Sequence, residues 1–111
     1  MFLFLKEKKY PFKFFIFTLY QRWDERNYDD LEKIFAFCAE HNINAILMFE
    51  GLFNSRINDL SKKYDIPIYL HTVNSLVKIA KYLKDVKGVF TDDVTKAMLN
   101  EYISNINKSL I

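Results

Sequence analysis

The hydrophobic and polar positions divide the chain into alternating strand and helix segments. Short apolar runs rich in aromatic and β-branched residues occur at residues 14–20, 45–49, 66–72 and 88–91. Continuous runs of this length are typical of strands that are covered on both faces, as in a parallel sheet. Apolar residues recur at helical spacing after each run. The pattern therefore predicts four consecutive strand–helix units.

The helical segments carry signals for their inner faces and for their starts. Apolar residues three and four positions apart lie on one face of a helix. The inner-face positions are Leu31, Ile34, Phe35 and Cys38; Ile57, Leu60 and Tyr64; Leu76, Ile79, Ala80 and Leu83; and Leu99, Tyr102, Ile103 and Ile106. Asn54 or Ser55 can cap the second helix, and Asn74 or Ser75 the third. Strands that alternate with helices imply a parallel sheet with right-handed crossovers.

The fold class is therefore α/β, and two architectures remain open. The four units form either an open sheet or half of a (β/α)₈ barrel, which typically uses about 250 residues. The many aromatic residues of the strands favour a sheet covered on both faces, whereas a half-barrel alone would expose its concave surface and two strand edges. We treat residues 1–111 as a single domain, and residues 1–10 as the remnant of a preceding helix.

Composition narrows the class of protein. Of the 111 residues, 50% are hydrophobic and 27% are charged, which is typical of a globular domain. A formal net charge of +2 without a basic block argues against nucleic-acid binding. The single cysteine, Cys38, excludes an internal disulfide, and its place on an apolar helix face favours a buried, inert thiol. No membrane span or secretory signal is recognisable, so we expect a cytoplasmic protein.

Polar residues follow the last two predicted strands. His71, Thr72 and Asn74 end one strand segment, and Thr91 and Asp92 end the next. Parallel α/β folds place their chemistry at the carboxyl ends of strands, so these residues mark the expected site.

Three segments in series resemble the carboxyl-terminal part of the glycerophosphodiester phosphodiesterase and phosphatidylinositol-phospholipase-C-like barrels. They are Phe-Ile-Phe-Thr-Leu-Tyr at 15–20, Ile-Pro-Ile-Tyr-Leu-His-Thr-Val-Asn at 66–74 and Gly-Val-Phe-Thr-Asp at 88–92. The resemblance implies the second half of a TIM barrel that hydrolyses phosphoric diesters in lipid or glycerol metabolism. It also implies an acid–base histidine and a divalent metal, Mg²⁺ or Ca²⁺, in the full-length family.

The resemblance carries over a substrate-binding set but no catalytic or metal-binding residue. The substrate-binding residues it implies are Thr18, Tyr20, His71, Asn74 and Asp92, with Thr91 beside Asp92. The His-Arg-Gly and Glu-x-Asp motifs, which the resemblance assigns to amino-terminal strands, are missing, and the only histidines are His41 and His71. We expect no cofactor in this chain. A departure at Met48-Phe49-Glu50, where relatives tend to have Thr-Met-Pro, affects the pocket floor.

Several residues have a chemical and a structural interpretation. Asp92 and Asp93 could hold a metal, but an N-cap of the last helix is the favoured role. Glu50 could be a base, but a solvated loop residue is favoured. Arg22 with Trp23 could clamp a phosphate, but an exposed loop is the simpler account.

Two main functional hypotheses follow. The first is a glycerophosphodiester phosphodiesterase-like fragment, inactive alone, that binds a small phosphodiester when an amino-terminal half completes it; His71 is then a pocket residue rather than an acid or base. The alternative is a non-catalytic half-barrel module that forms a homodimer or complements a partner half. A flavodoxin-like sheet that binds an anionic ligand ranks last, because the chain has no Gly-x-Gly phosphate loop.

Overall fold

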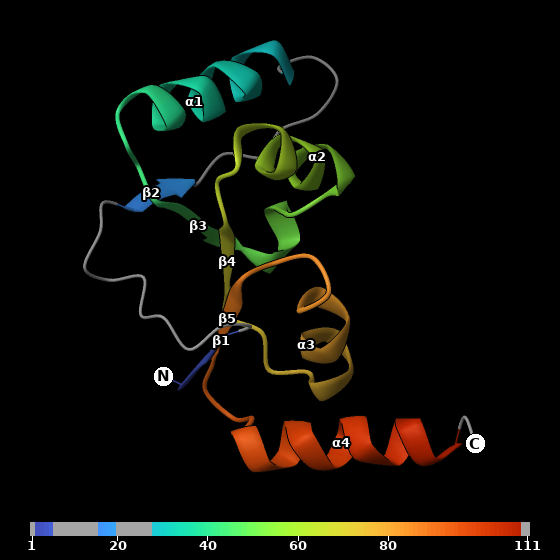
Figure 1. Cartoon of the computed structure of the whole chain (residues 1–111). Helices are drawn as coiled ribbons and strands as arrows, with labels where there is room; N and C mark the ends of the chain where they lie inside the picture. Colours follow the sequence, from blue (N-terminus) through green and yellow to red (C-terminus); the bar gives the residue numbers. More distant parts are fainter. Residues whose placement is uncertain (1, 6–15, 20–27, 110–111) are drawn as a thin grey trace.

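A computed structural model of the chain describes residues 2–5, 16–19 and 28–109, and these residues form an α/β fold (Figure 1). The strands β2 (Ile16–Leu19), β3 (Ala45–Phe49), β4 (Ile68–His71) and β5 (Gly88–Thr91) pair in parallel. They lie side by side in the order in which the chain forms them. The predicted alternation of parallel strands and helices is therefore confirmed.

Four helices follow the four parallel strands. They are α1 (Tyr28–Glu40), α2 (Ser55–Tyr64), α3 (Leu76–Tyr82) and α4 (Lys96–Ser109). Right-handed crossovers between neighbouring strands put the connecting helices on one side of a sheet. In Figure 1, α2 and α3 lie on the same side, with α1 next to α2 and α4 next to α3. No described helix lies on the opposite side, and none is long and apolar enough to cross a membrane.

Short-range signals set the starts of α2 and α3 as predicted. The Asn54 side chain accepts a hydrogen bond from the Ile57 amide at 2.9 Å, and the Ser75 hydroxyl accepts one from the Lys78 amide at 3.3 Å. The prediction that Asp92 or Asp93 caps α4 is wrong. The loop after β5 is longer than the sequence pattern suggests, so α4 begins only at Lys96. Thr95, directly before α4, takes the capping role, and its hydroxyl accepts a hydrogen bond from the Met98 amide at 3.2 Å.

The hydrophobic core lies between the sheet and the helices. Strand residues Ile46, Met48, Ile68, Leu70 and Val89 are fully or almost fully buried and belong to one cluster with apolar helix residues. The helix residues of this cluster are Leu31, Phe35, Cys38, Ile57, Leu60, Ile79 and Leu99. Side chains alternate along a strand, so the residues between these strand positions face the side without described helices.

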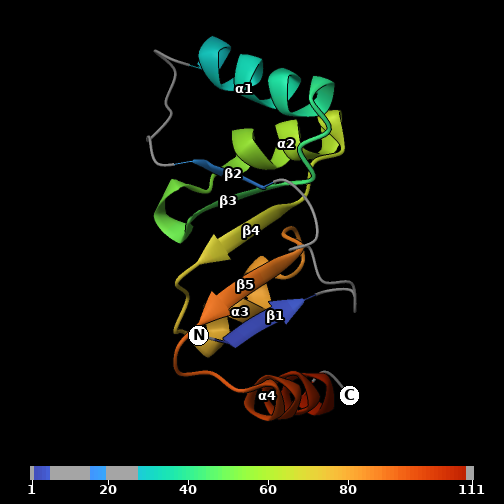
Figure 2. The same ribbon diagram turned by 90° about the vertical axis from the view of Figure 1, so that its left-hand side faces the viewer.

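A fifth strand, β1 (Phe2–Leu5), corrects the interpretation of residues 1–10 as a helix remnant. It runs antiparallel to β5, with Phe2 opposite Thr91 and Leu5 opposite Gly88, and forms the edge of the sheet beyond β5 (Figure 2). A four-residue apolar run has the same appearance in a strand and in a buried helix, so periodicity could not distinguish them. Residues 6–10 lie outside the described part.

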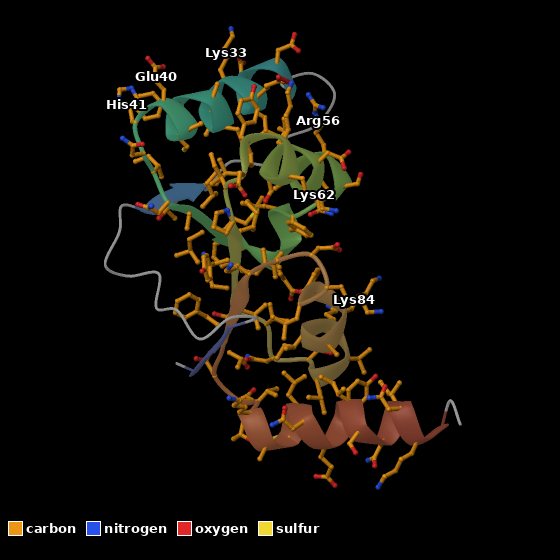
Figure 3. The ribbon with its side chains drawn as sticks, viewed as in Figure 1. Lys33, Glu40, His41, Arg56, Lys62 and Lys84 are labelled. Carbon is orange, nitrogen blue, oxygen red and sulfur yellow. The ribbon has the colours of Figure 1, made fainter. Side chains whose placement is uncertain are left out.

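A cluster centred on Glu32 joins α1 to α2. The Glu32 carboxylate accepts from Lys63 Nζ at 2.8 Å, from Arg56 Nη2 at 3.1 Å and from the Tyr64 hydroxyl at 3.1 Å. Figure 3 shows Arg56 on the side of α2 near α1, whereas Lys33 and Glu40 point outward from α1. The hydrogen bonds from Lys63 and Tyr64 hold the pKa of Glu32 below its ordinary value of 4.5.

Replacement of Glu32 by glutamine should remove a stabilisation that depends on pH. Because the pKa of Glu32 is lower in the folded state, the stabilisation is present above pH 4.5 and is lost as the pH falls through the folded-state pKa. Urea unfolding at several pH values should show E32Q less stable than the parent at neutral pH, with the difference shrinking in acid.

The matched control is D30N, since the described ion pair of Asp30 is a weak one with the exposed Lys33, at 3.8 Å on the same helix. D30N should change the unfolding midpoint little at any pH. A stability difference between E32Q and the parent that stays constant down to strongly acidic pH would contradict the assigned role.

Candidate functional site

The carboxyl ends of the parallel strands carry the residues that the sequence singled out. His71 is the last residue of β4 and Thr91 the last residue of β5, while Asn74 and Asp92 lie in the loops that follow. Thr18 is in β2, two strands away from β4. Tyr20 lies outside the described residues, as do Arg22 and Trp23 of the proposed phosphate clamp.

Asn74 connects the ends of β4 and β5. Its Oδ1 atom accepts hydrogen bonds from the Thr91 hydroxyl at 3.0 Å and from the Asp92 amide at 2.9 Å. The buried Thr91 hydroxyl in turn accepts from the Val94 amide at 3.3 Å. A backbone bond of 2.9 Å from the Val73 amide to the Phe90 carbonyl runs alongside. The two loops are therefore fixed to each other, and the Asn74 carbonyl is committed to holding them.

His71 packs against Phe49, its neighbour in register on β3. The two ring centroids are 4.3 Å apart, and the Phe49 side chain remains 53% exposed. Desolvation by burial lowers the pKa of His71 below its ordinary value of 6.5, so the imidazole is neutral at pH 7. A neutral imidazole can donate one hydrogen bond and accept one. His71 is thus a polar group beside one exposed aromatic ring, that of Phe49.

The candidate residues form two groups rather than one. Thr18 pairs with Leu47 and His71 pairs with Phe49, so Thr18 and His71 face the side of the sheet without described helices. Asn74, Thr91 and Asp92 make their hydrogen bonds at the ends of β4 and β5. The described contacts bring the second group together and leave Thr18 three strands from β5.

Glu50 lies at the carboxyl end of β3, and the sequence did not predict its surroundings. It begins a short 3-10 helix, Glu50–Leu52, directly after β3 and is half-buried rather than a solvated loop residue. Its Oε2 atom is buried without a hydrogen-bond partner. Burial and a hydrogen bond to Glu50 raise the pKa of Tyr82. Tyr82 is distant in sequence, and no local pattern pointed to this contact.

The described residues do not contain a ligand set for a divalent metal. No group of three or more His, Cys, Asp or Glu side chains in residues 2–5, 16–19 and 28–109 is placed to hold an ion. Asp92 and Asp93 are both exposed and adjacent in the loop. His41 is exposed and follows α1, at the amino-terminal end of β3 and therefore away from the carboxyl ends of the strands. The metal implied by the resemblance therefore does not fit these residues.

Comparison with known proteins adds no family: no family model, no curated protein and no solved structure matches the chain.

Removal of the Asn74 side chain should destabilise the joined loops. N74A leaves the buried Thr91 hydroxyl without its acceptor, which should cost about 1–3 kcal/mol in the free energy of unfolding. Chemical denaturation measures this loss. The control N100A, at an exposed position of α4, should change stability by less than about 0.5 kcal/mol. Equal effects of the two substitutions would show that the Asn74 hydrogen bonds contribute nothing specific.

The His71 imidazole should titrate with a midpoint below 6.5. Its ring signals can be followed by NMR between pH 4 and 8. F49A exposes His71 to water, so the midpoint should rise toward the ordinary value. A His71 midpoint above 6.5, or one that F49A leaves unchanged, would contradict desolvation as the cause.

Proposed function

We propose that the chain is a glycerophosphodiester phosphodiesterase-like domain that corresponds to the carboxyl-terminal half of such a barrel. The observation that supports this best is the strand order: β2, β3, β4 and β5 are parallel and each lies next to the one before it. Consecutive units of a (β/α)₈ barrel have this order. A flavodoxin-like sheet needs a reversal of strand order, and the four parallel strands have none.

The proposed role of this half is to form part of the wall of a phosphodiester pocket. Thr18 and His71 offer a hydroxyl and a neutral imidazole on the same side of the sheet. Both suit hydrogen bonds to glycerol hydroxyls or phosphate oxygens. Asn74 acts by fixing the loops after β4 and β5, which places Asp92 at the strand ends. The proposal assigns bond cleavage to an acid–base histidine and metal-binding carboxylates supplied by a partner half.

The antiparallel strand β1 adds a condition to the proposal. It occupies the edge of β5 where a complete barrel would place a parallel strand. A barrel completed by an amino-terminal half therefore requires β1 to leave that edge. The same condition applies to an eight-stranded ring closed by two copies of this chain.

A second candidate function is a non-catalytic interaction module. The side of the sheet without described helices supports it, because the Phe49 side chain is 53% exposed there, although Tyr69 on the same side is buried. On this hypothesis the chain binds a partner half or a second copy and cleaves nothing.

The purified chain should bind glycerol phosphodiesters weakly and should not hydrolyse them. Glycerophosphocholine with Mg²⁺ or Ca²⁺ should give no turnover above background, because the sequence lacks the His-Arg-Gly and Glu-x-Asp motifs and no described contact pairs an acid with a base. In NMR titrations with glycerophosphocholine, amide shifts should concentrate at Thr18, His71 and Asn74, and H71A should weaken them.

Two outcomes would contradict the proposed function. Turnover by the chain alone would show that it contains the groups that cleave the bond. Shifts that are absent at millimolar ligand, or that survive H71A and appear instead around the exposed His41, would leave the interaction module as the better account. The variant H41A is the matched control and should not alter binding.

A further inference from the structure

The end of β3 makes contacts on both sides of the sheet. Phe49, its last residue, packs against His71 on the side without described helices, with 4.3 Å between the ring centroids. Glu50, the next residue, is hydrogen-bonded to the Tyr82 hydroxyl of α3, which lies on the helix side (Figure 1). Successive side chains of an extended backbone point to opposite sides, and Phe49 is extended, with φ −60° and ψ 144°. One short piece of backbone therefore carries the contact with His71 and the contact with α3.

Tyr82 is a fixed point for the second of these contacts. It is the last residue of α3, and its carbonyl accepts hydrogen bonds from the Asp85 and Val86 amides, each at 2.9 Å. Its ring lies edge-on to Phe53 with 6.1 Å between the centroids, and both rings pack against the core. The Phe53 amide donates to the Glu50 carbonyl at 3.1 Å and closes the 3-10 turn. The turn after β3 is therefore anchored to α3 through the carboxyl group of Glu50 and the ring of Phe53.

Glu50 is an expensive residue for an anchor that serves stability alone. Its Oε2 atom is buried and has no hydrogen-bond partner in the part of the chain that the structure describes. Burial of an unpaired polar atom costs free energy, which an apolar side chain in the same space would avoid. A hydrogen bond adds direction, because donor and acceptor must meet at a defined distance and angle. The arrangement therefore favours a role in setting the position of the turn.

We propose that Glu50 and Tyr82 are positioning residues for His71, because their hydrogen bond holds the turn after β3 and so keeps the Phe49 ring against the imidazole. Phe49 is the last residue of β3 that pairs with β4, and its side chain is 53% exposed. Terminal pairs of a strand open more readily than central ones, so an anchor directly after Phe49 has a large effect on its position. The inference rests on the proposed function in one respect, that His71 belongs to the wall of the phosphodiester pocket.

The imidazole itself reports whether the contact is in place. Burial lowers the pKa of His71 below 6.5, and the Phe49 ring covers part of the imidazole. If the Phe49 ring moves away, water reaches the imidazole and its pKa rises. The ring current of Phe49 also shifts the NMR signals of the His71 ring protons. A residue that only stabilised the fold would change the unfolding midpoint and leave both of these signals as they are.

NMR titration of His71 in the full-length Y82F variant tests the proposal. The substitution removes the hydroxyl that bonds to Glu50 and keeps the ring that packs against Phe53. The titration midpoint of His71 should rise part of the way from the parent value to the value in F49A. The His71 ring signals should move in the same direction, toward their positions in F49A.

Two further sets of variants serve as controls. Y64F also removes a tyrosine hydroxyl that bonds to a glutamate, but the partner is Glu32 and the bond joins α1 to α2. Y64F should leave the midpoint and the ring signals of His71 as in the parent. E50Q keeps a side-chain oxygen that can accept from Tyr82, so it should retain the parent ring signals, whereas E50A should shift them as Y82F does. Urea unfolding shows whether each variant is folded.

Three outcomes would overturn the positioning role: an unchanged His71 in Y82F, an equal change in Y64F, or E50Q and E50A that behave alike. Titration with glycerophosphocholine separates this inference from the proposed function. If the parent binds the diester and Y82F leaves His71 unchanged, the positioning role fails alone. If Y82F moves the His71 midpoint but the parent binds no diester, the proposed function fails alone. If both are correct, Y82F should bind glycerophosphocholine more weakly than Y64F.

Discussion

The structure depends on burial of one side of a parallel sheet. Because the parallel strands follow one another without a change of order, every right-handed crossover returns over the same side. Leu70 and Ile46 are completely buried there, together with the apolar faces of the helices. The same constraint leaves the opposite side without a described helix. Both functional hypotheses start from this asymmetry. The phosphodiesterase-like hypothesis places a substrate on that side of the sheet, and the interaction-module hypothesis places a protein partner there.

At the strand ends, residues of the candidate site also hold the fold together. Asn74 was identified as a site residue, and its carbonyl oxygen is occupied in holding Thr91 and Asp92. His71 remains neutral because burial disfavours its charged form. The Asn74 side chain that joins the two loops and the neutral His71 imidazole are compatible with a pocket wall, and neither supplies a nucleophile. The described strand ends therefore offer hydrogen-bonding groups and no nucleophile.

The sequence predicted those features that depend on neighbouring residues. Asn54 and Ser75 cap their helices through bonds to amides three positions away, so local spacing was sufficient. Continuous apolar runs identified the parallel strands because both faces of these strands are apolar. The pairing of Phe2 with Thr91 and the contact of Glu50 with Tyr82 join residues far apart in the chain, and no periodicity encodes such pairs. Periodicity likewise identified the apolar face of α4, but it did not show that α4 extends beyond its neighbour α3.

The position of Cys38 has a practical consequence. The thiol is completely buried under α1, and burial raises its pKa, so the reactive thiolate is scarce in the native state. It is the only sulfhydryl group of the chain, and its alkylation requires an opening that exposes it. The rate of modification by a small thiol reagent therefore reports how often the core around α1 opens.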